Sequence, residues 1–144
     1  MELRVGEGVS GFRTLAASVD EFCTTHGVPD DARRDVQVAL DEIVNNAVRH
    51  AAPRHPAIDV RLSIAGADIE IGIEDDGEPF DPRDAPAPDL ALPLADRPVG
   101  GLGLFLVRKL MDDVEYRRSG GKNCVTLRRR LSGPRPPGTP VPAR

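Results

Sequence analysis

The stretch Val36–Ala51, VQVALDEIVNNAVRHA, constrains the fold more than any other part of this chain, because its apolar residues recur with the period of an α-helix. The apolar side chains that cover one side of this helix are Val36, Leu40, Ile43, Val44, Ala47 and Ala51. Polar side chains collect on the other side, where Glu42 and Asn46 are four residues apart and lie one above the other. The pattern predicts a helix that buries one face and presents polar groups on the opposite face.

A carboxylate and an amide at this spacing suit one kind of chemistry. Glu42 can act as a general base, and the amide oxygen of Asn46 can bind Mg²⁺. A solvent-exposed helix face would contain the same residues, and for this helix alone that is the simpler interpretation. Two glycine-containing turns further along the chain favour a functional site at Glu42 and Asn46 over an exposed helix face.

The patterns around this helix predict the remaining elements. These are an edge strand near residues 3–5, helices at 10–26 and from about 30 to 51, strands at 58–64 and 69–73, a short helix at 104–111, and strands at 114–118 and 123–131. Two antiparallel hairpins with helices on one face predict an α+β fold, a two-layer α/β sandwich with a mixed, mostly antiparallel sheet.

In two segments, prolines interrupt both the helical and the strand periodicity of the apolar residues. Residues 78–100 contain six prolines, which fits either disorder or a functional lid inside a compact domain, and we expect a lid. Residues 132–144 contain five prolines and little that could join a core, so we expect a disordered tail. The folded domain is then expected to cover residues 1–131.

Length and charge limit the class of protein. A chain of 144 residues is long enough for one domain with a single core, and its formal net charge of −4 argues against nucleic acid or anionic lipid as the main partner. The N-terminus has no basic-then-apolar signal, and no apolar run approaches the length of a membrane span. The two cysteines form no metal or redox motif. We therefore expect a cytoplasmic protein without a membrane partner.

The segment DDGEP at residues 75–79 follows a predicted buried strand. The carboxylate of Asp75 can accept a hydrogen bond from an exocyclic amine such as that of adenine, and Gly77 lets the backbone approach a ring. A plain Asp-Gly turn at the end of a strand is the alternative interpretation.

The run Gly100–Gly103 precedes the short helix, and the free N–H groups of a helix N-terminus suit phosphates. A tight turn into a helix would have the same sequence. The spacing matches neither GxGxxG nor GxxxxGK[ST], so neither Rossmann nor Walker chemistry is indicated. Lys122, Asn123 and Thr126 are candidates for the polar lining of the same cleft, although ordinary hairpin residues would look alike.

Taken together and in order, these motifs resemble those of the GHKL, or Bergerat-fold, ATP-binding family. The chain is most similar to the stand-alone branch of this family, the anti-sigma-factor serine/threonine kinases of the RsbW and SpoIIAB type. The N-box, Glu-x-x-x-Asn followed by His-Ala, is matched by residues 42–46 and by His50-Ala51. The Asp-x-Gly box with its Phe-Asp-Pro continuation is matched by residues 75–77 and 80–82, and the Gly-x-Gly-Leu box by residues 101–104. The likeness covers roughly residues 1 to 131.

The resemblance implies a role for each matching residue. Glu42 is expected to be the general base, Asn46 the ligand that holds Mg²⁺ against the phosphates, and Asp75 the residue that recognises the adenine amine. The residues expected to contact ATP are Asn46, His50, Asp75, Gly77, Gly101, Gly103, Leu104 and Thr126. Arg13, a looser match, falls where the branch has an arginine at its partner-binding surface. Pro79 stands where the wider family often has a second glycine.

The resemblance also implies a function. The chain has no room for a transducer domain or a dimerising helix pair, so it fits a protein kinase that binds its substrate in trans. The first hypothesis is an ATP-dependent serine/threonine kinase that acts as an anti-sigma factor and phosphorylates a STAS-type anti-anti-sigma protein; the branch suggests a homodimer. The second hypothesis is a binding module that ATP switches with little or no transfer. The third, a structural domain without a ligand, survives only if Mg-ATP fails to bind.

Overall fold

The computed structural model describes residues 1–84, 91 and 101–131, with only the backbone described at 101 and 102. Its elements are β1 (Glu2–Arg4), α1 (Gly8–Thr25), α2 (Asp30–Ala51), β2 (Ile58–Ala65), β3 (Asp68–Asp75), the 3₁₀ turn η1 (Pro82–Asp84), α3 (Gly101–Leu110), β4 (Asp113–Ser119) and β5 (Lys122–Arg130). The segments expected to form most of the lid and the tail lie outside the described residues.

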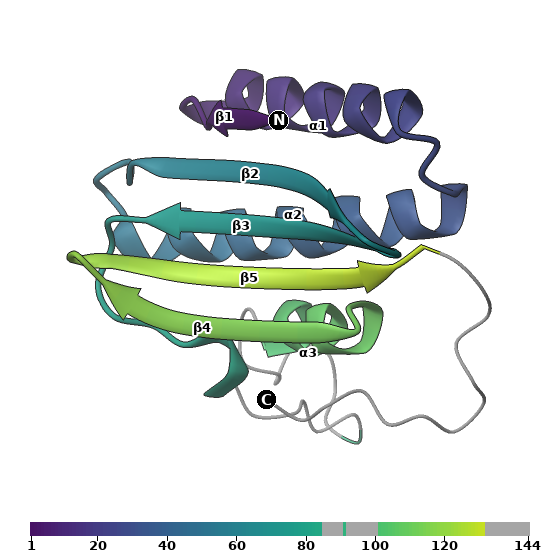
Figure 1. Cartoon of the computed structure of the whole chain (residues 1–144). Coiled ribbons are helices and arrows are strands. Elements are labelled where there is room, and N and C mark those ends of the chain that lie inside the picture. Colours follow the sequence, from purple (N-terminus) through teal and green to yellow (C-terminus); the bar gives the residue numbers. More distant parts are fainter. Residues whose placement is uncertain (85–90, 92–100, 132–144) are drawn as a thin grey trace.

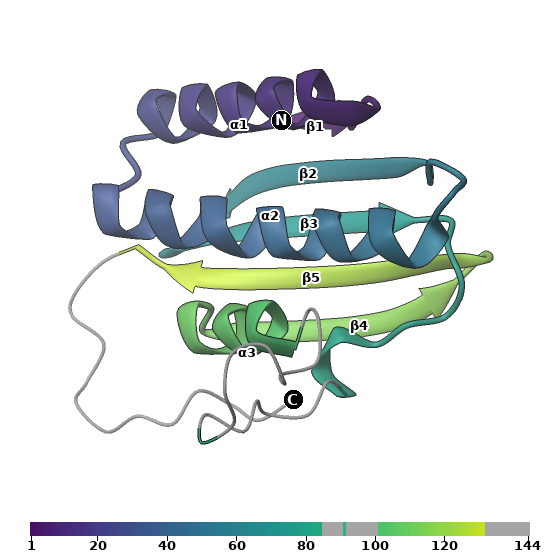
Figure 2. The same ribbon diagram turned by 180° about the vertical axis from the view of Figure 1, so that it is seen from behind.

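The strands form one sheet in the order β1-β2-β3-β5-β4, and each pair of described neighbours is antiparallel. Helices α1, α2 and α3 all lie on one face of this sheet, and the opposite face carries no helix of the described chain (Figures 1 and 2). This arrangement confirms the predicted two-layer α+β sandwich. The sheet differs from the prediction only in having no parallel pair among the described strands.

The core lies between the sheet and the helices, as the alternation of the strands requires. Ile69, Ile71 and Ile73 of β3 are at most 1% exposed, and they face the helix layer together with the inward residues of β2 and β5. The apolar side of α2 covers them, with Val36 and Val44 fully buried. The predicted period of α2 is therefore confirmed.

The N-terminus of α3 is the main difference in element bounds. The sequence predicts a helix from Leu104, but the structure begins it at Gly101, so the glycine run already forms the first helical turn.

The last hairpin, formed by β4 and β5, agrees well with the prediction. Gly120 and Gly121, with φ of 58° and 75°, form its two-residue connection, where both central residues need a positive φ.

None of the described helices is both long and apolar enough to cross a membrane. This finding agrees with the absence of a long apolar run in the sequence.

The central position of β3 predicts that its core residues carry much of the stability. Ile71 is fully buried, so Ile71→Ala should lower the free energy of unfolding by about 2–5 kcal/mol, from lost burial and the remaining cavity. Urea denaturation measures this change. Ile64→Ala on the neighbouring strand is the matched control, because Ile64 is 38% exposed and should lose much less. Equal losses for the two variants would contradict the assigned core.

Candidate functional site

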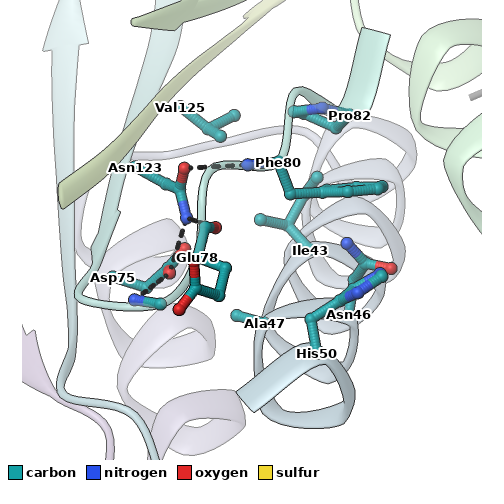
Figure 3. Close-up of a pocket in the computed structure, with 11 residues that line it drawn as sticks. Ile43, Asn46, Ala47, His50, Asp75, Glu78, Phe80, Pro82, Asn123 and Val125 are labelled. Atoms are coloured by element: carbon teal, nitrogen blue, oxygen red, sulfur yellow. Dashed lines mark hydrogen bonds between the residues drawn. The ribbon is translucent and has the colours of Figure 1, made fainter. Parts of the chain in front are cut away.

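A small pocket lies where the C-terminal half of α2 faces the C-terminal end of β3 and the N-terminal part of β5 (Figure 3). Its lining residues are Ile43, Asn46, Ala47 and His50 from α2, Asp75, Gly77, Glu78, Phe80 and Pro82 from the end of β3 and the segment after it, and Asn123 and Val125 from β5. The volume is about 20 Å³, which is room for about one water molecule. Four of the predicted site residues, Asn46, His50, Asp75 and Gly77, meet in this pocket.

Asp75 is the last residue of β3 and is only 8% exposed. Its Oδ1 accepts two hydrogen bonds of 2.9 Å, one from the backbone N–H of Gly77 and one from Nδ2 of Asn123. Its Oδ2 accepts no hydrogen bond from the described residues. A Cβ on Gly77 would lie 2.9 Å from Oδ1, so the turn needs glycine to approach the carboxylate. The pocket therefore contains one carboxylate oxygen that a ligand donor can reach.

Asn123 joins several walls of the pocket and was only a minor candidate in the sequence. It is 4% exposed; its Nδ2 donates to Asp75 and to the carbonyl of Glu78, while its Oδ1 accepts from Tyr116 and from the backbone N–H of Phe80. The sequence contains a signal for this residue. Asn123 stands in phase with the buried Val125 and Leu127, and it is the one buried polar residue of β5.

The same alternation contradicts the prediction for Thr126. Inward positions of β5 are odd-numbered, so Thr126 lies on the opposite face of the sheet with Cys124. There it pairs with Gly72 and lines a separate hollow with Arg61. The sheet therefore separates Thr126 from the pocket.

His50 and Phe80 form an aromatic wall. Their rings stack with centroids 4.3 Å apart and planes inclined by 28°. His50 belongs to the last turns of α2, and the backbone of Phe80 is held by Asn123. His50 was a predicted site residue, whereas Phe80 entered the sequence argument only through its motif.

Asn46 and Glu42 lie one turn apart on α2, as their spacing requires. Asn46 is 7% exposed and lines the pocket, and its Oδ1 accepts a hydrogen bond of 2.9 Å from Arg49. Glu42 is half-buried outside the lining, with its carboxylate directly against Gly103 of α3. A Cβ at Gly103 would overlap that carboxylate, so this glycine leaves the space that Glu42 occupies.

The other predicted residues lie further from the pocket. Gly101 is the first residue of α3, and Leu104 is 4% exposed within the hydrophobic core. Arg13 is an exposed residue of α1 and takes no part in the pocket lining. The structure therefore brings together the N-box and the Asp-x-Gly box, places the first turn of α3 beside Glu42, and leaves Leu104 in a packing role.

No group of three or more His, Cys, Asp or Glu side chains in the described ranges could hold a metal ion. A hard cation at this pocket would have the amide oxygen of Asn46 as a protein ligand. An amide oxygen has two lone pairs, and Arg49 uses one of them.

The turn η1 continues from the pocket and is organised by Asp81. This carboxylate accepts hydrogen bonds from the backbone N–H of Arg83 at 2.9 Å and from its guanidinium at 2.8 Å. Burial pushes the pKa of Asp81 up, but the hydrogen bonds and the charge of Arg83 outweigh burial and leave the pKa lowered. Arg108 of α3 donates to the carbonyl of Arg83 at 3.1 Å, which joins η1 to α3.

Comparison with known proteins gives one family. The sequence model of the histidine kinase-like ATPase domain matches residues 10–129. The chain is similar to the serine/threonine-protein kinase BtrW of Bordetella bronchiseptica, with 39% identity over 97 residues that cover 66% of this chain and 68% of the relative. It is also similar to the serine-protein kinase RsbW of Staphylococcus epidermidis, with 38% identity over 130 residues that cover 83% of this chain and 80% of the relative.

Another similar protein is the serine-protein kinase RsbW of Halalkalibacterium halodurans, at 33% identity over 99 residues; the match spans 66% of this chain and 61% of that relative. Among solved structures, the RsbU and RsbW domains of Rv1364c from Mycobacterium tuberculosis are similar, with a TM-score of 0.67 and 21% identity. The match covers 93% of this chain and 33% of that one. At this identity the structural likeness supports the fold alone.

The lowered pKa of Asp81 predicts an acid-dependent loss of stability. The pKa lies below its unfolded value of about 4, so the ionised carboxylate stabilises the protein above that pH and the contribution is lost as pH falls through the folded-state pKa. Asp81→Asn should therefore cost about 1 kcal/mol at pH 7 and progressively less toward pH 3. Urea denaturation of the wild type and of Asp81→Asn at pH 7, 5 and 3 measures this difference in the free energy of unfolding. Asp84→Asn, in the same turn but exposed, is the control; a penalty for Asp81→Asn that does not change with pH would contradict the assignment.

Proposed function

Because this chain belongs to the histidine kinase-like ATPase domain family, we propose that it is a serine/threonine protein kinase that uses ATP. The observation that carries the proposal is the pocket at the end of β3, where Oδ2 of Asp75 accepts no hydrogen bond from the described protein groups. The kinase names of the relatives support the same activity.

The base of the nucleotide is assigned to this pocket. The exocyclic amine of adenine donates to Oδ2 of Asp75, while Gly77 and the apolar Ile43 and Val125 lie around the ring position. His50 and Phe80 supply aromatic surface at the same wall. The donor and acceptor properties of the lining therefore fit a base that carries an amine.

The phosphates are assigned to the junction of α2 and α3. The first backbone N–H groups of α3 have no partner within the helix, and these groups together with the positive end of the helix dipole attract anions. Asn46 would hold Mg²⁺ through the lone pair that Arg49 leaves open, which fits an ion that takes most of its ligands from phosphates and water. When bound, the ion neutralises charge on the transferring phosphoryl group.

Glu42 is assigned as the general base. It lies one turn from Asn46 and directly against Gly103, so its carboxylate is at the proposed phosphate position. It takes the proton from a serine or threonine hydroxyl of the protein substrate as that oxygen attacks the γ-phosphorus. The bond from the γ-phosphorus to the bridging oxygen of ADP breaks, and the products are ADP and a phosphoserine or phosphothreonine.

The protein substrate is proposed to be a STAS-type anti-anti-sigma protein, with a sigma factor as the alternative partner that the kinase sequesters. The support for this partner is the similarity to relatives named RsbW, in a family branch of anti-sigma-factor kinases. The exposed Arg13 on α1 is the proposed partner contact, and its surface is separate from the nucleotide pocket.

The proposal is tested by capture of the tagged protein from its native lysate in Mg-ATP, followed by mass spectrometry with phosphosite mapping. We expect a small STAS-like protein phosphorylated on serine or threonine. Recovery of only an unphosphorylated regulator, with ATP bound, would favour a nucleotide-gated binding module instead.

If Glu42 is the general base, its removal should reduce phosphoryl transfer but not ATP binding. Glu42→Ala should lower phosphoryl transfer by about 10²–10⁴-fold, the usual contribution of a general base, and leave ATP binding nearly unchanged. Radiolabelled transfer to the captured partner and equilibrium binding of ATP separate the two effects. Asp41→Asn is the matched control, since Asp41 is the neighbouring carboxylate and is exposed. Unchanged transfer by Glu42→Ala would show that another group takes the proton.

The role of Asn46 predicts a change that depends on magnesium. Asn46→Ala should weaken binding of Mg-ATP by about tenfold or more, and binding of ATP in EDTA much less. Isothermal titration with and without Mg²⁺ measures the difference. Asn45→Ala, at the adjacent exposed position of the same helix, is the control. Equal losses with and without Mg²⁺ would contradict the assignment as a metal ligand.

A further inference from the structure

The side chain of Asn123 has no unused hydrogen-bonding capacity. Its Nδ2 donates to Oδ1 of Asp75 at 2.9 Å and to the carbonyl of Glu78 at 2.8 Å. Its Oδ1 accepts from the hydroxyl of Tyr116 at 2.7 Å and from the backbone N–H of Phe80 at 3.1 Å. Both amide hydrogens and both lone pairs of the oxygen are therefore used, at a residue that is 4% exposed.

The four partners also fix which way the amide points. Exchanging the oxygen and nitrogen of Asn123 would oppose three of these contacts, because Asp75 Oδ1 and the carbonyl of Glu78 only accept and the N–H of Phe80 only donates, whereas the hydroxyl of Tyr116 can do either. The side chain is thus held in one orientation, between the end of β3, the segment that follows it, and β4. Figure 3 shows the contacts to Asp75 and Phe80 on the two sides of Asn123.

This orientation determines what Asp75 can do. Two N–H donors occupy Oδ1 and hold the carboxylate of Asp75 in one orientation, so it meets a ligand through Oδ2, as an acceptor. Its Oδ2 is left for the ligand. A base with an amine opposite Oδ2 gains a charge-assisted hydrogen bond, whereas a base with a carbonyl there places two acceptors face to face.

We propose that Asn123 is the positioning residue that sets the discrimination between an amine and a carbonyl on the bound base, by holding the carboxylate of Asp75 as a pure acceptor. The inference rests on the proposed function, because it assumes that a nucleotide base enters this pocket. It goes beyond that function in assigning base selectivity to a residue on β5 that need not touch the base.

The alternative is that Asn123 only stabilises the fold. The two roles differ in one measurable quantity, the ratio of the dissociation constants for ITP and ATP, because inosine has a carbonyl where adenosine has the amine. A residue that only stabilises the fold would change both affinities together and leave their ratio constant. A positioning residue changes the ratio.

The experiment measures this ratio by equilibrium titration in Mg²⁺ for the full chain and its variants. In the wild type we expect ATP to bind at least tenfold more tightly than ITP. In Asn123→Ala the carboxylate loses a donor and its fixed orientation, and the ratio should fall by about tenfold. Tyr116→Phe is the control: it removes one hydrogen bond to Asn123 and leaves both bonds to Asp75, so it should keep the ratio within about twofold.

Asn123→Asp tests the same idea with a side chain of nearly the same shape, should the alanine variant fail to fold. It replaces the amide donor that lies 2.9 Å from Oδ1 of Asp75 with a second acceptor, so the carboxylate loses this fixed donor. The preference for ATP over ITP should therefore fall in this variant as well.

The outcomes of this experiment distinguish a failure of the role assigned to Asn123 from a failure of the proposed kinase function. A ratio unchanged in both Asn123 variants overturns the inference, while ATP binding by the wild type leaves the kinase proposal intact. Wild-type binding without a preference for ATP also overturns the inference. Loss of the preference in the Asn123 variants supports the inference even when no phosphoryl transfer is found, an outcome that would count against the kinase alone. Failure of the wild type to bind any nucleotide overturns both.

Discussion

The burial of the apolar side of α2 against the central strands determines where every polar group of the site can lie. Val36, Leu40 and Val44 are at most 1% exposed, and they fix both the rotation and the axial position of the helix on β3 and β5. Once this face is fixed, Asn46 and His50 have to point along the edge of the sheet where β3 ends. A rotation of α2 would expose apolar area and would also separate Asn46 from Asp75, so stability and function constrain the helix together.

The site places polar atoms inside this apolar layer and satisfies most of them with hydrogen bonds. Asp75 and Asn123 occupy inward positions that Ile73 and Val125 fill elsewhere on the same strands, and a buried polar group without a partner is costly. The network around Asn123 satisfies each of its groups and also satisfies Oδ1 of Asp75. Of the side-chain oxygen and nitrogen atoms of Asp75 and Asn123, Oδ2 of Asp75 alone has no hydrogen-bond partner among the described residues, and a ligand can replace water there.

Local patterns predicted those parts of the site that depend on local structure. The helical period brings Glu42 and Asn46 together, and turn chemistry places Asp75 beside Gly77. A few neighbouring residues are enough to predict each of these arrangements. Asn123 depends on contacts with residues 7 to 48 positions away, which no local pattern reports. Its phase on β5, however, was available from the alternation of the strand.

The two errors, at Thr126 and at the start of α3, have different physical causes. Thr126 was placed in the site because it lies near the last turn, but side chains of neighbouring strand residues point to opposite faces, so distance along a strand is a poor guide. The sequence predicts that the glycine run opens a helix from Leu104, whereas α3 already begins at Gly101. The structure places the helical backbone of Gly103 against Glu42, and only a residue without a Cβ allows that approach. The alternation of β5 is therefore a local signal that gives the correct face for Thr126, whereas the position of Gly103 depends on a tertiary contact.

The two walls of the pocket are held by different kinds of contact. The wall formed by Asp75 and Asn123 is held by backbone and side-chain hydrogen bonds from β3, β4 and the segment at 77–80. The opposite wall is the ring stack of His50 and Phe80, and His50 is an exposed residue in the last turns of α2. Rotation of these two side chains breaks one ring contact, whereas moving the other wall breaks several hydrogen bonds of buried groups. Widening the pocket on the side of the stack therefore breaks fewer contacts than widening it on the side of Asp75 and Asn123, the groups proposed to recognise the base.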